Sequence, residues 1–223
     1  PFESMPGVID PERGWMGTAN NRLAPDDYPY LLFGRWSSGH RAECIRNMIE
    51  GNEQFTRENF CGMQHDTLSM RAVRCVPPLV ETLNSCDDER IHSAVRILKD
   101  WDFRCEIDHP GPSIFNVFFI KWAKSVADEH FDEPTAALLS KGAEGVAARM
   151  LIDDQIEWFQ NGDRDQKILS AFNDALDLLT ELLGPKMSDW QWGNLHQMSL
   201  KHVLSSRGDL GILLDHGGGP MKG

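Results

Sequence analysis

Asn20 and Arg41 are the residues whose types and positions best suit chemistry on a carbonyl group. Asn20 ends a short run of strand formers that includes Trp15 and Thr18. An Asn amide fixed at a strand end is a neutral N–H donor, and acyl-transfer sites use such donors to hold a developing oxyanion. The alternative is a turn, because Asn tolerates left-handed dihedrals and bonds to its own backbone. From the residues alone the turn is the preferred interpretation.

Arg41 is expected on the apolar stripe of a helix that Ser37 or Ser38 caps and that runs to about Ile49. An arginine on a buried helix face must find an anion or several acceptors, because its charge cannot be shed. It could pair with a carboxylate such as Asp66. It could instead face a site that binds a carboxylate or polarises a neighbouring group. The spacing does not decide between these two interpretations.

A series of short motifs runs in order along most of the chain. They are TANN at 18–21, DDYPY at 26–30, Trp36, GHRAECI at 39–45, MQHDTLS at 63–69, LKDWD at 98–102, SIFN at 113–116, WQWGNLH at 190–196 and His202. Together they resemble the central part of the β-subunit of the penicillin acylases, a family that includes the cephalosporin acylases and the acyl-homoserine-lactone acylases. Each motif alone is weak, and the ordered series is fairly specific.

This resemblance implies an N-terminal-nucleophile (Ntn) hydrolase that cleaves an acyl amide bond. In that family a precursor cuts itself and exposes a serine, whose own α-amine acts as base. An Asn side chain and a backbone N–H form the oxyanion hole. Asn20 maps onto that Asn, with Asn21 as the alternative if the register slips by one residue. Arg41 maps onto an arginine near the nucleophile's amine that helps to position the Asn.

The chain departs from the family pattern at its first residue. Pro1 has no side-chain nucleophile, and no internal serine stands where the family places it. We therefore expect the isolated chain to be inactive. The partners implied are the remainder of the acylase (the Ntn core and the α-subunit) and a small acyl-amide substrate. The family also implies a periplasmic or extracellular location. It leaves calcium open for the complete enzyme, with no cofactor or metal ligand assigned in this chain.

Composition limits the classes of partner. The formal net charge is −12, which argues against a nucleic-acid or anionic-membrane binder, since both need a basic surface. No apolar run approaches the length of a membrane span. The chain has 5 cysteines and no Cys-x-x-Cys pair, so a disulfide framework or a zinc knuckle is not expected.

Apolar periodicity predicts a mainly α fold, with at most one or two short strands near the N-terminus. The resemblance implies that this is the helical domain of an Ntn-hydrolase (αββα) β-subunit. Residues 1–36 are expected to form an extended lead-in, a short strand and an active-site loop. Residues 37–205 are expected to form the helical domain, and 206–223 a glycine-rich tail. Pro77 and Pro78 are expected to split one helix into two pieces.

Two other function classes remain open. The first is a non-catalytic helical domain that only binds or scaffolds. The second is a zinc-dependent hydrolase using His196 and His202, which ranks last because the two histidines lack the one-turn spacing of paired metal ligands on a helix.

Overall fold

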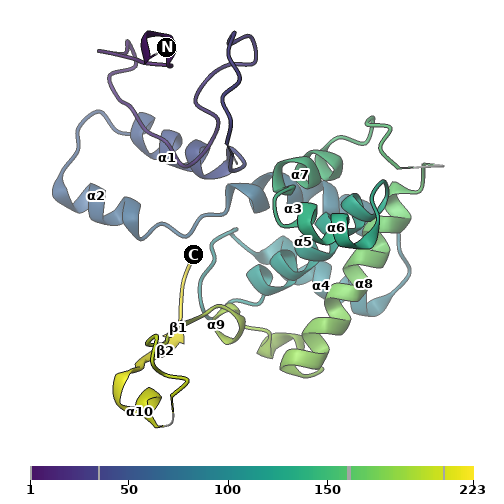
Figure 1. Cartoon of the computed structure of the whole chain (residues 1–223). Coiled ribbons are helices and arrows are strands. Elements are labelled where there is room, and N and C mark those ends of the chain that lie inside the picture. The colour runs from purple at the N-terminus through teal and green to yellow at the C-terminus, as the bar shows by residue number, and fades with distance from the viewer. Residues whose placement is uncertain (1, 35, 160–161, 208) are drawn as a thin grey trace.

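The computed structural model describes residues 2–34, 36–159, 162–207 and 209–223. The prediction of a mainly α fold is confirmed (Figure 1). In chain order, the elements of the described part are η1 (Phe2–Ser4), α1 (His40–Glu50), α2 (Arg57–Gln64), α3 (Met70–Leu83), α4 (Glu89–Asp100), α5 (Gly111–Asp128), α6 (Glu133–Ser140), α7 (Glu144–Ile152), α8 (Arg164–Leu183), η3 (Met187–Asp189), α9 (Trp192–Leu195), β1 (Gln197–Leu200), α10 (Leu210–Leu214) and β2 (His216–Pro220).

Helix α5 lies at the centre of the helical body, where it packs against α4, α6, α7 and α8. Its sequence is apolar over most of its length, so it is buried on several faces. Phe118 of α5 meets Phe172 of α8 with their ring centroids 5.7 Å apart. The Trp122 indole N–H donates to the Ala147 carbonyl at 2.8 Å, which fixes α7 on the same core.

Helix α3 is continuous through Pro77 and Pro78, so the prediction of two helical pieces is wrong. The physical reason is burial on both sides of the prolines. Cys75 and Leu79 are fully buried, and α3 packs against α4, α7 and α8. That packing outweighs the loss of backbone hydrogen bonds that each proline imposes.

Residues 2–64 form an N-terminal arm beside this body (Figure 1). Neither α1 nor α2 contains a buried residue, although α1 packs against α3. Helix α1 begins after Gly39, which gives no side-chain cap, so the predicted serine cap at 37 or 38 is wrong. The first turn instead meets the 19–37 segment through the side chain of Arg41. Because α1 covers little core, Arg41 is exposed rather than on a buried face.

The strands lie at the other end of the chain from the predicted ones. No strand occurs in residues 2–34, whereas β1 and β2 pair antiparallel in the C-terminal region. Gly218 permits the pairing, because a Cβ at this position would collide with the Met198 carbonyl oxygen. No helix in the described ranges is both long and apolar enough to cross a membrane.

Candidate functional site

The backbone at Asn20 is left-handed, with φ at 61°. Asn is one of the few residue types that adopt this conformation at little cost. The Asn20 carbonyl accepts a 2.8 Å hydrogen bond from the Ser37 backbone N–H. The neighbouring Ala19 is buried, so the backbone leading into Asn20 is anchored. The left-handed backbone therefore sets the direction of an exposed side chain at the end of an anchored segment.

Arg41 reaches back from α1 to this segment. Its Nη2 donates to the carbonyl of Ala19 at 2.9 Å and to the Asn20 Oδ1 at 2.9 Å. The Ser37 hydroxyl accepts a longer bond of 3.4 Å from the same nitrogen. All three partners are neutral acceptors, and Arg41 makes no ion pair within the described residues. The structure therefore brings the two candidate residues into contact and leaves the positive charge of Arg41 uncompensated.

The contact with Arg41 fixes the orientation of the Asn20 amide. A guanidinium has only donors, so the amide must turn its oxygen toward Arg41 and its NH₂ group away. In the described part of the chain, the Asn20 Nδ2 donates to no acceptor. The result is a neutral N–H donor that is held by its own oxygen and exposed to an incoming group.

Asn21, the alternative oxyanion residue, is used differently. Its Oδ1 accepts from the Ala19 backbone N–H at 3.0 Å, and its Nδ2 donates to the Arg22 carbonyl at 3.1 Å. The oxygen and the nitrogen of this amide are therefore both bonded within the local turn, as expected for an Asn that bonds its own backbone. Of the two neighbouring Asn side chains, only Asn20 has an Nδ2 that donates to no acceptor among the described residues.

Asp66 is not the counter-ion of Arg41, so that interpretation is wrong. Its Oδ1 accepts from Arg104 at 2.8 Å, and its Oδ2 accepts from the Cys44 thiol at 3.3 Å. Burial alone would raise the pKa of Asp66, but the hydrogen bonds from Arg104 and Cys44 outweigh it and lower the pKa. Arg104 pairs with Asp66 because backbone hydrogen bonds between residues 67–69 and 103–105 hold the two side chains close together.

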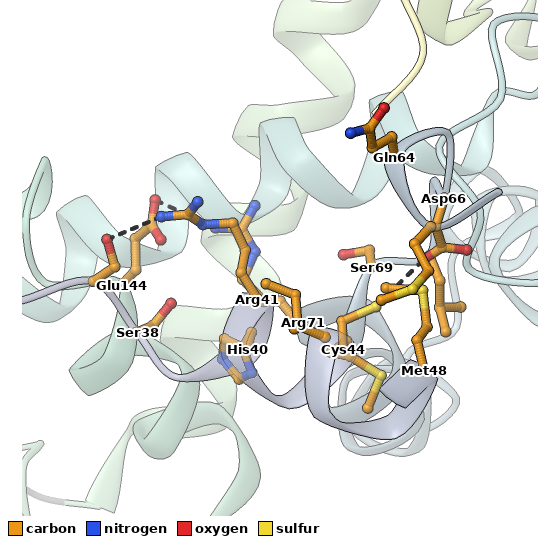
Figure 2. A pocket seen from close by; sticks show the side chains of 15 residues that line it. Ser38, His40, Arg41, Cys44, Met48, Gln64, Asp66, Ser69, Arg71 and Glu144 are labelled. Carbon is orange, nitrogen blue, oxygen red and sulfur yellow. Dashed lines mark hydrogen bonds and ion pairs between the residues drawn. The ribbon is translucent and has the colours of Figure 1, made fainter. Parts of the chain in front are cut away.

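Arg41 lines a groove of about 700 Å³ between α1, the segment that joins α2 to α3, and the start of α7. Figure 2 shows Arg41, Arg71 and Glu144 among the residues around it. Arg71 donates to the Asn116 Oδ1 at 2.8 Å, lies 3.5 Å from Glu144, and stacks over the Phe119 ring at 4.4 Å. The sequence analysis did not single out Arg71. Its spacing of four residues from Cys75 could have indicated that its charge lies on the apolar face of the helix.

His40 also lines the groove, one residue before Arg41. Burial lowers its pKa from the ordinary value, and the positive charge of Arg71 lowers it further. Both effects favour the neutral imidazole.

The residues considered for metal binding do not form a cluster. The His196 ring shares a 2.9 Å bond with the Met221 carbonyl, whereas the His202 ring accepts from the Leu204 N–H at 3.2 Å. Asp26 pairs with Arg22. Across the described ranges, no three His, Cys, Asp or Glu side chains are grouped so that they could hold a metal ion.

Comparison with known proteins identifies the family and the relatives of this chain. The family described as Penicillin amidase matches residues 1–223. Penicillin acylase 2 proenzyme from Pseudomonas sp. (strain SE83) is 26% identical over 217 residues, covering 93% of this chain and 27% of that protein. Acyl-homoserine lactone acylase QuiP from Pseudomonas syringae pv. syringae is 24% identical over 213 residues, covering 84% of this chain and 26% of that protein.

A solved structure shares the fold. The thermostable penicillin G acylase from Alcaligenes faecalis superposes with a TM-score of 0.63 at 17% identity, covering 85% of this chain and 40% of that one. The chain thus spans about a quarter of the length of the two curated relatives. With the ordered motifs, the helical fold and a family match over every residue, the chain belongs to the penicillin amidase family.

Proposed function

We propose that this chain is the part of a penicillin-acylase-type amidohydrolase that supplies an oxyanion donor, Asn20, and a positioning arginine, Arg41. One observation carries the proposal: Arg41 holds the Asn20 Oδ1 at 2.9 Å and so presents the Nδ2 donor outward. A preorganised neutral donor is what stabilises the tetrahedral intermediate of acyl transfer, because it needs no reorganisation as the charge develops.

Arg41 contributes in two ways under this proposal. It fixes the geometry of the Asn20 amide. Its uncompensated positive charge also lies directly behind the amide that would bind the developing oxyanion. A carboxylate partner would cancel that charge, and Asp66 is kept away by Arg104. The substrate is a small acyl amide, and the nucleophile is a serine at the start of the complete β-chain. The partners are the remainder of the acylase, its Ntn core and α-subunit. Pro1, which lacks a side-chain nucleophile, lies outside the described residues.

Surface composition supports a large polypeptide partner. Leu31 and Phe33, in the loop between the two candidate residues, are 87% and 96% exposed. Val203 and Ile212, in the C-terminal region, are 89% and 84% exposed. Exposed apolar surface marks interaction sites where it is contiguous, and a partner that covers these residues fits a chain that corresponds to about a quarter of its relatives. We also propose a periplasmic or extracellular location for the complete enzyme, as the family resemblance implies.

The test uses the complete polypeptide as its host makes it. Asn20→Gly keeps the left-handed backbone accessible and removes only the amide, so kcat should fall on the order of a hundredfold or more while the fold is kept. The matched control is Asn21→Gly, which removes an amide already used by its own turn and should change kcat by no more than a few fold. A kcat for Asn20→Gly within severalfold of wild type would reject the assignment.

The alternative is a non-catalytic helical binding or scaffold domain. The helical body supports it, because α3, α4, α5, α7 and α8 share one apolar core. Intact mass and N-terminal sequencing of the native protein separate the two proposals. The acylase proposal expects two associated chains, of which the one containing Asn20 and Arg41 starts with serine. A single unprocessed chain without amidase activity would favour the scaffold.

A further inference from the structure

Helix α1 carries Arg41 but contributes no residue to the buried core of the helical body. None of its 11 residues is buried, although the helix packs against α3. An element with few buried apolar contacts is held weakly, because little apolar surface is lost to water when it moves. The polar contacts of α1 therefore matter for its orientation on α3.

Glu43 joins α1 to the body through an ion pair with Arg74 of α3. Its Oε2 accepts from the Arg74 Nε at 3.0 Å, and its Oε1 accepts from the Arg74 Nη2 at 2.5 Å. A carboxylate and a guanidinium that share two hydrogen bonds are fixed in orientation as well as in distance. The Cys44 thiol also reaches beyond α1, to Asp66 at 3.3 Å, but a neutral thiol is a weak donor. The Glu43–Arg74 pair is the stronger of the two contacts.

Glu43 and Arg41 hold α1 from different sides. Each residue of a helix advances by about 100°, so side chains two residues apart point about 200° apart. Arg41 reaches the Ala19 carbonyl and the Asn20 Oδ1 on one side. Glu43 reaches α3 on the other side. The first turn of α1 is thus clamped between the segment that carries Asn20 and the helical body.

We propose that Glu43, through its pair with Arg74, is a positioning residue for the Asn20 amide. The pair holds the first turn of α1 in the orientation in which Arg41 bonds the Asn20 Oδ1. The effect on turnover rests on the proposed function, whereas the orientation of α1 does not. Glu43 acts through Arg41 and is not itself placed among the groups that bind the oxyanion.

The position of the pair on the surface separates its effect on turnover from its effect on stability. The side chains of Glu43 and Arg74 are 26% and 51% exposed. An ion pair with this much contact with water contributes little to the free energy of unfolding. A small displacement of a catalytic group, in contrast, costs much in rate. Loss of the pair should therefore lower turnover far more than it lowers the melting temperature.

The test breaks the pair and then rebuilds it with the charges exchanged. Arg74→Glu places two carboxylates side by side, and the double variant Glu43→Arg with Arg74→Glu restores an ion pair. The matched control is Arg96→Glu, which makes the same change of charge and breaks the exposed Arg96–Glu89 pair on α4. All variants are made in the complete polypeptide, with Asn20→Gly beside them.

Steady-state kinetics on a chromogenic acyl anilide that the wild type cleaves give kcat and KM separately. Arg74→Glu should lower kcat about tenfold or more and leave KM within a few fold of wild type, because the oxyanion donor acts in the transition state. The exchanged pair should recover most of the lost kcat, and Arg96→Glu should behave as wild type. Melting curves check that each variant is folded.

Hydrogen exchange read by mass spectrometry tests the orientation of α1 independently of turnover. The amides of residues 44–50 should exchange about fivefold faster or more in Arg74→Glu and return to the wild-type rate in the exchanged pair. Unchanged exchange would overturn the inference, and so would an exchanged pair that recovers neither exchange nor kcat.

The Asn20→Gly variant separates this inference from the proposed function. A normal kcat for Arg74→Glu in an enzyme that Asn20→Gly impairs would overturn the positioning role of Glu43. A normal kcat for Asn20→Gly, together with faster exchange in Arg74→Glu, would instead reject the proposed function and support the clamp on α1.

Discussion

At the scale of single residues, the site depends on which acceptors Arg41 finds. A guanidinium that met Asp66 would be a neutral ion pair, and its charge would do little for a reacting carbonyl. The observed partners are the Ala19 carbonyl, the Asn20 amide and the Ser37 hydroxyl, all uncharged. The same three contacts order Asn20, so one side chain provides both charge and geometry.

The cysteines allow a prediction about thiol reactivity. Burial raises the pKa of Cys75 to about 12 and that of Cys105 to about 11, whereas Cys61 is exposed. Only the thiolate reacts, so raising the pH speeds the reaction of a thiol until its pKa is reached. We expect Cys61 to react with a disulfide reagent at pH 8 within minutes. Cys75 and Cys105 should react only after unfolding in guanidinium chloride.

The Cys61→Ser variant is the control for this experiment and should lose the fast phase alone. Rapid labelling of Cys75 or Cys105 in the folded protein, detected by mass spectrometry of the peptides, would contradict the burial of these two side chains.

At the scale of elements, α3 stays helical because neighbouring helices pack around it, although its two prolines disfavour a helix. Pro77 is exposed and lies in the middle of the helix, so its ring removes a hydrogen bond without filling the core. Pro77→Ala restores the N–H that can donate to the Val73 carbonyl. We expect the free energy of unfolding to rise by about 1–2 kcal/mol, less than the full helix cost of proline because the unfolded chain becomes freer.

Urea denaturation of the full chain measures this change. Pro134→Ala is the matched control, because Pro134 is also exposed but lies in the first turn of α6, where proline costs nothing. The control should lower stability slightly or leave it unchanged. A destabilised Pro77→Ala protein would mean that the ring of Pro77 makes contacts that stabilise α3.

Helices α4, α5 and α8 could be predicted from the sequence because their apolar residues recur at helical spacing over three or more turns. Gly184, at φ 88°, marks the end of α8 as expected for a glycine in the left-handed region. The proximity of Asn20 and Arg41 was expected only through the family resemblance, since 20 residues separate them in sequence and no local pattern links them.

Other features could not be predicted, because they depend on contacts between distant segments. The continuity of α3 depends on burial among three other helices. The choice of Arg104 over Arg41 by Asp66 depends on the backbone pairing of Leu68 with Arg104. The β1–β2 pair requires that a glycine-rich tail return to a strand some 20 residues earlier, which local propensity disfavours.

At the scale of the whole molecule, the contact between α5 and α8 is the main link in the helical body. Phe118 and Phe172 are both fully buried and meet across it. Phe118→Ala and Phe172→Ala should each lower the free energy of unfolding by about 3–5 kcal/mol, through lost burial and the cavity left behind. The double variant should show a coupling of about 0.5–1.5 kcal/mol, as for other aromatic pairs.

Thermal and urea unfolding of the four proteins in the cycle provide these values. Phe131→Ala serves as the control, because Phe131 is 43% exposed and should change stability by less than either core variant. Strict additivity of the two core substitutions would show that the rings do not interact directly.

The hydrogen bond between the Ser37 N–H and the Asn20 carbonyl has a consequence for how this family can diversify. Together with Arg41, it clamps the two ends of the 21–36 loop at its base. Lengthening a clamped surface loop costs little, about 0.6 kcal/mol for each doubling. Insertions and deletions between the clamped ends can therefore reshape the surface around Leu31 and Phe33 while the Asn20 amide stays in place.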